Sequence, residues 1–300
     1  MAITKFANMV VVPEHFTTYV NERTTEKSAL VQSGVAAPDA RVAQVINSTP
    51  QGGNMITMPF YKPLSGDDEI FGEDALTPDG VQTGSERATL LIRQKAWGTT
   101  DLARVKGGSD PMAAIMNMVS DWWLEREQAI FISVLKGLFG ASGALATNHM
   151  LDISTQSGAA AVIGVDATLD AKDLMGDAYK KITAIAMHSA TFTKLQKQQK
   201  IETVYSSGLK VDIDTYLGYR VIVDDSLPVN SGVYDTYLIG AGAFTRDSGT
   251  PDGLISTETD RDKLKAEDFL INRKAFVLHP NGVSFKGTPT KAYATNQDLE

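Results

Sequence analysis

The sequence contains no cysteine among its 300 residues. This absence excludes disulfide bonds, thiolate metal sites and a cysteine nucleophile. Histidine is also scarce, so few imidazole groups are available for chemistry: His15, His149, His188 and His279. No apolar run approaches the roughly 18 to 20 residues that a membrane-spanning helix needs, and the first residues lack the pattern of a signal peptide. We expect a soluble chain without a membrane partner, stabilised by packing and assembly.

Positive charge is in the minority, with 28 Lys and Arg against 36 Asp and Glu and a net charge of −8. A protein that grips nucleic acid through its phosphates needs a clustered basic surface. The densest basic group, Lys194, Lys197 and Lys200, fits one helix face, and no third of the chain carries a net positive charge. The sequence therefore argues against direct, tight binding of nucleic acid.

The N-terminal third predicts an arm followed by a long hairpin. The first 35 residues have apolar positions at uneven spacing, which predicts an arm with one short helix, and residues 36–50 are small and polar. Strand-forming residues follow at 55–61 and 88–93. The segment between these strands is acidic and aperiodic, and it is too long for an ordinary hairpin turn. We expect a hairpin that projects from the body and lies over a neighbouring subunit.

The strongest local signal predicts a long helix over residues 111–139. Asp110 is a good N-cap, Pro111 suits the first helical position, and no further proline interrupts the segment before Gly140. Apolar residues recur at spacings of 3, 4 and 7, and others widen the stripe. The helix is therefore expected to be a central spine packed on more than one side, with these residues in its core: Met116, Val119, Trp122, Trp123 and Ile130.

The second half of the chain predicts an α/β region with a mixed sheet. Residues 140–167 are rich in Gly, Ala and Ser and predict a connecting, partly β segment. A helix is expected over 171–181, a strand over 182–187 and a helix capped by Ser189 that ends at Gln199. Further strands are expected at three places: 219–223, 234–239 and 276–278.

Three patterns invite a catalytic interpretation, and each has a simpler structural one. Adjacent His188 and Ser189 point in different directions, so a helix cap is favoured over a nucleophile and base. Gly240 and Gly242 lack the third glycine of a dinucleotide loop, so a tight turn or bulge is favoured. Adjacent tryptophans on the long helix are favoured as core or interface over a platform for stacking bases.

Four aspartates could hold Mg²⁺ or Ca²⁺, since acids on alternate strand positions share a face: Asp212, Asp214, Asp224 and Asp225. Aspartate beside a strand is common at turns, however, and no phosphate-binding loop accompanies these residues. The acidic hairpin offers a second possible Ca²⁺ site, although a solvated loop that docks on a basic neighbour is favoured. We therefore predict no catalytic residue, no cofactor and no metal site.

Six stretches of the sequence, in this order, resemble the major capsid proteins of tailed double-stranded-DNA bacteriophages, which have the Hong Kong 97-like fold. The similarity looks greatest to siphophage coat proteins of Gram-positive hosts and runs nearly end to end. The six stretches are 12–14, 28–34, 107–112, 186–191, 220–229 and 271–283. An α+β fold is implied, with an N-terminal arm, an extended β-hairpin called the E-loop, a peripheral domain with a long spine helix, and an α/β axial domain.

By this resemblance the regions follow one another along the chain: N-terminal arm 1–50, E-loop 51–98, peripheral domain 99–167 with spine helix 111–139, axial domain 168–265, and return to the peripheral domain 266–300. The E-loop residues expected to contact a neighbouring subunit are Asp67, Asp68, Glu69, Phe71, Glu73 and Asp74. Some relatives begin with a helical scaffolding segment. None is recognisable here, so a separate scaffolding protein is implied.

The function implied is that of a structural shell subunit, not an enzyme. It would self-assemble as pentamers and hexamers into an icosahedral head that encloses double-stranded DNA, and it would be a virion component assembled in the host cytoplasm. Besides other copies of itself, its expected partners are the scaffolding protein, the portal protein and a decoration protein. Two alternatives remain: the shell protein of an encapsulin-type nanocompartment, and a metal-dependent enzyme that uses Asp212, Asp214, Asp224 and Asp225.

Overall fold

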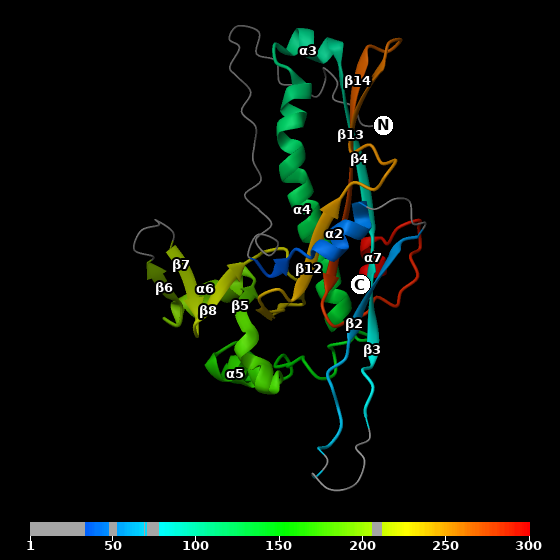
Figure 1. Cartoon of the computed structure of the whole chain (residues 1–300). Coiled ribbons are helices and arrows are strands. Elements are labelled where there is room, and N and C mark those ends of the chain that lie inside the picture. The colour runs from blue at the N-terminus through cyan, green and yellow to red at the C-terminus, as the bar shows by residue number, and fades with distance from the viewer. Residues whose placement is uncertain (1–33, 48–52, 69, 71–77, 206–211) are drawn as a thin grey trace.

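The computed structural model describes residues 34–47, 53–68, 70, 78–205 and 212–300. Most of the predicted N-terminal arm, including its short helix, lies outside these residues. The described chain forms an elongated body in which one long helix runs beside a large sheet, with a second sheet to one side and a two-stranded ribbon at one end (Figure 1). None of the helices in these described ranges is long and apolar enough to cross a membrane.

The large sheet is built around the 14-residue strand β14. One edge of β14 pairs with β4 over ten residues, and the other edge pairs first with β13 and then with β12. Short β1 lies parallel to β12 at the end of the sheet. The strands are β1 (Ala36–Ala37), β4 (Leu91–Thr100), β12 (Phe244–Gly249), β13 (Thr257–Asp262) and β14 (Glu267–Pro280). Of these strands, the sequence predicted residues 276–278 in the second half of β14 and the first three residues of β4.

The expected strand at 88–93 is a junction between two strands. Strand β2 (Met55–Tyr61), as predicted, pairs with β3 (Thr83–Thr89) to form the ribbon, and β4 begins at Leu91 and joins the large sheet. Helix α2 (Ala40–Asn47), which was not predicted, packs at the root of the ribbon. Its Val42 and Ile46 are buried with residues of β2, β3 and β14, so tertiary contacts hold this short helix in place.

The long helix α4 (Pro111–Phe139) confirms the predicted range. The Asp110 carboxylate accepts a hydrogen bond of 3.1 Å from the backbone N–H of Met112, which satisfies one of the free donors of the first turn. A shorter helix, α3 (Asp101–Gly107), precedes it and ends at Gly108, whose φ of 64° is the left-handed conformation that glycine adopts without strain.

The second sheet has the order β11-β5-β8-β7-β6. Strands β5 and β8 are parallel and the other pairs are antiparallel, which confirms the predicted mixed sheet. Helix α6 (Ser189–Lys197) packs on it through Leu195. The strands are β5 (Ile182–Met187), β6 (Glu202–Tyr205), β7 (Asp212–Tyr216), β8 (Tyr219–Val223) and β11 (Tyr237–Gly240).

Several local predictions in this half were wrong in extent. The helix expected over 171–181 is α5 (Val165–Asp173) followed by the 3₁₀ helix η3 (Gly176–Lys181), and the φ of 51° at Gly176 separates the two. The described segment 140–167 contains no strand and only the 3₁₀ turn η2 (Gly158–Ala161) before α5. The strand expected at 234–239 is divided into β10 (Val233–Tyr234), which pairs with β9 (Val229–Asn230), and β11.

The tight turn predicted at Gly240 and Gly242 is confirmed. Gly242 has a φ of 66°, and the register of β11 against β5 shifts between Ile239 and Gly240. An added side chain at Gly240 would meet the backbone oxygen of Lys181 at 2.9 Å, so glycine is required by close packing as well as by the turn.

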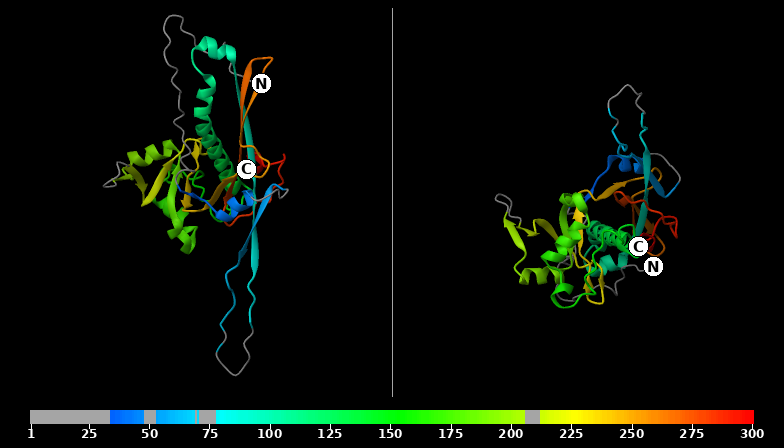
Figure 2. Two further views of the ribbon diagram at one scale, coloured as in Figure 1. Left: turned by 45° about the horizontal axis from the view of Figure 1, so that its top comes forward. Right: turned by 90° about the horizontal axis from the view of Figure 1, so that it is seen from below.

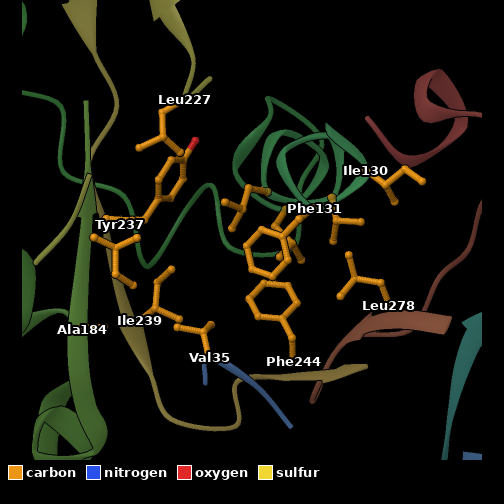
Figure 3. Close-up of a cluster of buried hydrophobic side chains, with 14 of the residues drawn as sticks. Val35, Ile130, Phe131, Ala184, Leu227, Tyr237, Ile239, Phe244 and Leu278 are labelled. Atoms are coloured by element: carbon orange, nitrogen blue, oxygen red, sulfur yellow. The ribbon is translucent and has the colours of Figure 1, made fainter. Parts of the chain in front are cut away.

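The main hydrophobic core lies where the second half of α4 meets both sheets. The rings of Phe131 on α4 and Phe244 on β12 are 4.5 Å apart, with Leu278 of β14 and Ile239 of β11 packed around them (Figure 3). Val35 enters the same cluster from the start of the described chain. This single cluster joins the two sheets through the helix, as expected for a central spine.

The expected buried stripe of α4 does not extend to its first turns. Trp123 and Ile130 are buried and Val119 and Trp122 are partly buried, but Met116 has an exposed fraction of 54%. Met116 lies seven residues before Trp123 and therefore on the same face of the helix. The placement of Met116 in the core is thus wrong for the single chain, because the sheet packs closely only against the later turns.

A buried ion cluster fixes α4 to the large sheet. The Glu127 side chain is 2% exposed and accepts two hydrogen bonds from Arg246 of β12, at 2.9 Å from Nε and 2.6 Å from Nη2. Lys274 of β14 donates to its other oxygen. A buried carboxylate needs such partners, because removing one of them would leave an uncompensated charge in the core.

Candidate assembly surfaces

The ribbon β2–β3 has two different faces. Ile56 and Ala88 lie opposite one another on the inner face and are buried at the root, whereas Arg87 and Ser85 are exposed on the outer face. Residues on the inner face are buried at the root of the ribbon and exposed further out. The ribbon projects from the body at the end opposite α3 (Figures 1 and 2). A two-stranded ribbon without a core beneath it is marginally stable alone, so this element is suited to contact another surface.

Of the predicted E-loop contact residues, the structure describes Asp67 and Asp68, which lie in the outer part of the ribbon. Asp67 and Asp68 are exposed. Glu69, Phe71, Glu73 and Asp74 lie outside the described residues. Apart from Phe71, sequence analysis singled out acids and missed the apolar residues nearby, whose exposure depends on the fold. Exposed apolar residues in the described part of the ribbon are Phe60, Tyr61, Leu64, Ile70 and Val81.

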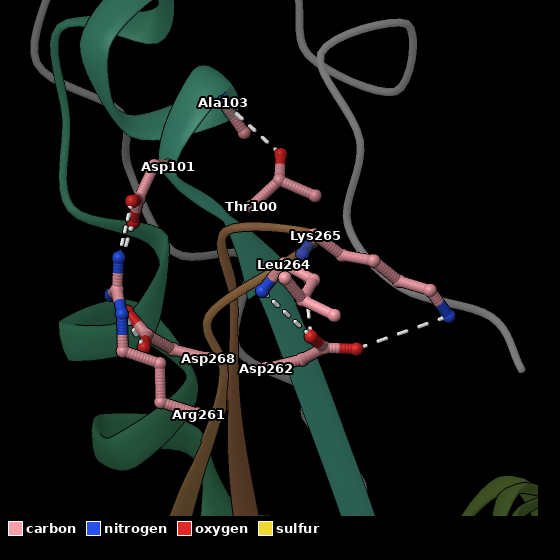
Figure 4. Close-up of polar contacts among 8 residues, drawn as sticks. All are labelled: Thr100, Asp101, Ala103, Arg261, Asp262, Leu264, Lys265 and Asp268. Carbon is pink, nitrogen blue, oxygen red and sulfur yellow. Dashed lines mark hydrogen bonds and ion pairs between the residues drawn. The ribbon is translucent and has the colours of Figure 1, made fainter.

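A second projection lies at the opposite end, at the turn that joins β13 and β14. Arg261 binds Asp101 at the start of α3 at 2.5 Å and Asp268 of β14 at 2.8 Å (Figure 4). The Asp262 carboxylate accepts a hydrogen bond of 3.0 Å from the backbone N–H of Leu264. The turn is therefore held in one conformation, yet the Leu264 side chain it presents is 100% exposed. An apolar side chain on a braced turn is suited to packing against another molecule.

Three of the four aspartates considered as metal ligands have structural partners: Asp214, Asp224 and Asp225. Asp224, directly after β8, accepts hydrogen bonds from the side chain of Gln128 on α4 and from the backbone N–H of Ser226 at 2.9 Å. Asp214 on β7 accepts one of 2.9 Å from the Thr203 hydroxyl on β6. The hydrogen bond from Gln128 to Asp224 connects α4 to the second sheet. Gln128 directly follows Glu127, which binds the large sheet.

Asp225 acts at the start of α6. Its Oδ1 accepts a hydrogen bond of 3.0 Å from the backbone N–H of Ser189, and hydrogen bonding to Ser189 holds the pKa of the Asp225 carboxyl below its usual value. The N-cap residue is His188 and not Ser189 as predicted, since the His188 Nδ1 accepts from the N–H of Ala190 at 3.1 Å. Within the described ranges, no three or more His, Asp and Glu residues are gathered as a metal site.

His279 is a buried titratable residue at the root of the ribbon. It lies on β14, and its Nε2 is 3.7 Å from the Glu86 carboxylate on β3. Burial lowers the pKa of the His279 imidazole, and the neighbouring Glu86 opposes this shift. The contact between His279 and the Glu86 carboxylate therefore lies at the root of the ribbon, where the ribbon joins the large sheet.

Comparison with known proteins identifies the family. The chain is 40% identical to the major capsid protein of Bacillus phage SPP1 over 292 residues, which covers 95% of this chain and 87% of that protein. This chain belongs to the phage major capsid protein family. The Gp13-like family, described as major capsid protein 13-like, matches residues 127–273, from the ion cluster on α4 to the middle of β14.

Solved structures support the fold of this family. A structure from Mycobacterium phage Che8 matches with a TM-score of 0.58 at 12% identity, covering 90% of this chain and 93% of that one. A holo-SrpI encapsulin complex from Synechococcus elongatus PCC 7942 matches with a TM-score of 0.53 at 12% identity, covering 89% and 88%. The predicted α+β class and Hong Kong 97-like capsid fold are thus confirmed, and family membership favours the capsid over the encapsulin alternative.

Proposed function

We propose that this protein is the structural subunit of a phage head shell. It assembles as pentamers and hexamers into an icosahedral container for double-stranded DNA, and it is therefore a component of the virion. The observation that carries this proposal is the pair of projections at opposite ends of the body, the β2–β3 ribbon and the β13–β14 turn, each with exposed apolar residues. Contacts between different surfaces of identical subunits close into rings, as capsomers require.

The regions of the family fold map onto this chain as part of the same proposal. Residues 1–50 serve as N-terminal arm, 51–98 as E-loop, 99–167 and 266–300 as peripheral domain, and 168–265 as axial domain. Support comes from the two sheets, which are connected through α4 and its hydrophobic core. Strand β4 is the part of the E-loop region that is anchored in the large sheet.

The proposed partners follow from this role. Copies of the same chain surround each subunit, and the E-loop residues given above, from Asp67 to Asp74, contact one of them. A separate scaffolding protein guides assembly in the host cytoplasm, and the portal protein and a decoration protein join the head. The net charge of −8 suits the wall of a container whose DNA must move during packaging, because a basic wall would bind it.

The direct test is the mass and shape of the expressed protein. We expect capsomers or megadalton particles by size-exclusion chromatography with light scattering, and round shells by electron microscopy. Mass spectrometry of purified particles then separates a phage head from a nanocompartment, since an encapsulin-type shell would contain a protein cargo. A protein that remains monomeric or dimeric in every condition would contradict the proposal.

We further propose that the aspartate pairs have no catalytic role. Replacing both Asp224 and Asp225 by Asn is expected to lower the free energy of unfolding by about 1 to 3 kcal/mol, because hydrogen bonds to Gln128 and Ser189 are weakened. Asp214→Asn is the matched control and should change it by less than about 0.5 kcal/mol. Thermal and urea unfolding measure both effects.

The same variants decide between a shell subunit and an enzyme. We expect no stoichiometric binding of Mg²⁺, Mn²⁺ or Ca²⁺ in calorimetric titrations, and no nuclease or phosphatase activity in the unmodified protein. Micromolar metal binding together with turnover that disappears in the double variant would support the metal-dependent enzyme instead.

A further inference from the structure

The inner face of the ribbon continues the hydrophobic core out of the body. Ile56 is buried with Ala88, Met58 is packed against the same cluster, and Phe60 further along is 41% exposed. Ile56, Met58 and Phe60 occupy alternate positions of β2, so their side chains share one face. The apolar pattern therefore does not end where the subunit's own core ends.

The outer part of this face is held in a defined arrangement. The Phe60 ring lies across Gly84 on the paired strand, where an added Cβ would meet the ring at 2.6 Å. An aromatic ring that covers a cross-strand glycine stabilises the pairing of the two strands. Beyond it Leu64 is 80% exposed and Val81 is also exposed. Exposed apolar residues grouped on a fixed element mark a surface that another molecule covers.

Acidic residues occupy the same outer part of the ribbon and have a different physical effect. Asp67, Asp68 and Asp79 are exposed, so any ion pairs they form are surrounded by water and screened by salt. Charges at the rim of an interface change mainly the rate of association and its salt dependence, whereas well-packed apolar groups determine how long the complex lasts. The two kinds of residue should therefore be separable by experiment.

We propose that Phe60 and Leu64 provide most of the binding energy when the ribbon docks on a second copy of this chain, and that the acids steer the approach. This inference rests on the proposed shell function. The negative charge of the ribbon disfavours DNA as its occupant, whereas each copy of the chain offers exposed Lys194 and Lys197 on α6, a helix that contains no acidic residue. Such a surface matches the ribbon in charge.

The test compares two kinds of variant under conditions in which the unmodified protein forms particles. Leu64→Ser should keep the thermal stability of the free subunit, because its side chain is exposed there, and lower particle yield at least tenfold at about 50 mM and about 500 mM salt. A double variant, Asp67→Asn with Asp68→Asn, should assemble to the same final yield. Its assembly should be several-fold slower at low salt only, because salt at the higher concentration screens the charges in both proteins.

The opposite pattern would overturn the inference. If the Asn variant lost its particles at both salt concentrations while Leu64→Ser assembled normally, the acids and not the apolar residues would hold the contact. That result would leave the shell function intact, since removal of the whole loop would still prevent assembly. If no variant and no loop deletion affected assembly, the proposed role of the ribbon itself would be wrong.

The absence of cysteine permits a direct second measurement, because one introduced thiol is unique in the chain. Leu64→Cys carrying a photoreactive maleimide should form crosslinks between copies in assembled particles and none in dilute free subunits. Ser85→Cys, on the outer face of the same ribbon, is the matched control and should crosslink much less. Crosslinks from Ser85→Cys but not from Leu64→Cys would place the contact on the outer face of the ribbon and contradict the proposal.

Discussion

Removal of residues 66–80 from the ribbon is expected to leave a folded subunit that no longer forms shells. The described residues of this outer segment, 66–68, 70 and 78–80, belong to none of the three hydrophobic clusters, which end near Met58 in the ribbon. Its two sides lie close together at Gly66, where an added Cβ would be 2.6 Å from the Asp79 carboxylate. An Asn-Gly turn can therefore join Ser65 to Val81 without stretching the remaining strands.

Circular dichroism and thermal unfolding should show the shortened subunit within about 0.5 kcal/mol of the unmodified one, since changes at exposed loop tips rarely affect a core. Sedimentation and electron microscopy should show that particles are absent. Intact shells from the shortened protein would contradict the assembly role. An unfolded product would be uninformative about assembly, so Leu64→Ser, which leaves the ribbon complete, provides the independent check.

Secondary structure could be predicted from sequence where local signals determine it. The range of α4 follows from Asp110, Pro111 and the uninterrupted run to Phe139, all of which act within a few residues. Helix α2 was missed because its eight residues carry no acidic first turn and no basic last turn. Its position depends on Val42 and Ile46 meeting β2, β3 and β14, which are distant in sequence. Such contacts cannot be read from a local pattern.

Strands of the large sheet could likewise be predicted only where a local apolar pattern was present. Residues 276–278 were predicted because they are consecutively apolar, but β14 begins at Glu267. Its first half lies between β4 and β13 and carries charged side chains, such as Asp268, that pair across strands. β13 itself is composed of threonine and charged residues, so its strand character depends on its partner. β13 has no apolar face, so the alternation of its side chains gave no strand signal.

The candidate contact surfaces were predicted only in part. The acidic composition of the hairpin indicated an element without a core, but it drew attention to Asp67 and Asp68 and away from Phe60 and Leu64, whose exposure depends on where the body ends. The braced turn that exposes Leu264 could not be predicted, because Asp101 and Arg261 are far apart in the sequence. Both surfaces depend on which segments the fold leaves uncovered, and periodicity does not report this.

Replacement of Trp123 by Ala is expected to destabilise the subunit by about 3 to 5 kcal/mol, as for other large aromatic residues in a core. Trp123 is buried between α4 and the large sheet, and its indole Nε1–H donates a hydrogen bond of 2.6 Å to the Asn272 side chain of β14. The ring also packs edge to face with Trp122 at 4.8 Å. The truncation would leave a cavity and remove a hydrogen bond to the strand at the centre of the sheet.

Urea and thermal unfolding of the free subunit measure this loss, and Met116→Ala is the matched control. Met116 lies on the same helix face two turns earlier but is 54% exposed, so its truncation should cost less than about 0.5 kcal/mol. If both variants lost similar stability, the first turns of α4 would be packed in the free subunit. If Met116→Ala kept its stability but reduced particle yield, that part of α4 would be covered only in the shell. A loss below about 1 kcal/mol for Trp123→Ala would contradict the packing of α4 against β14, and with it the role of this helix as the connection between the two sheets.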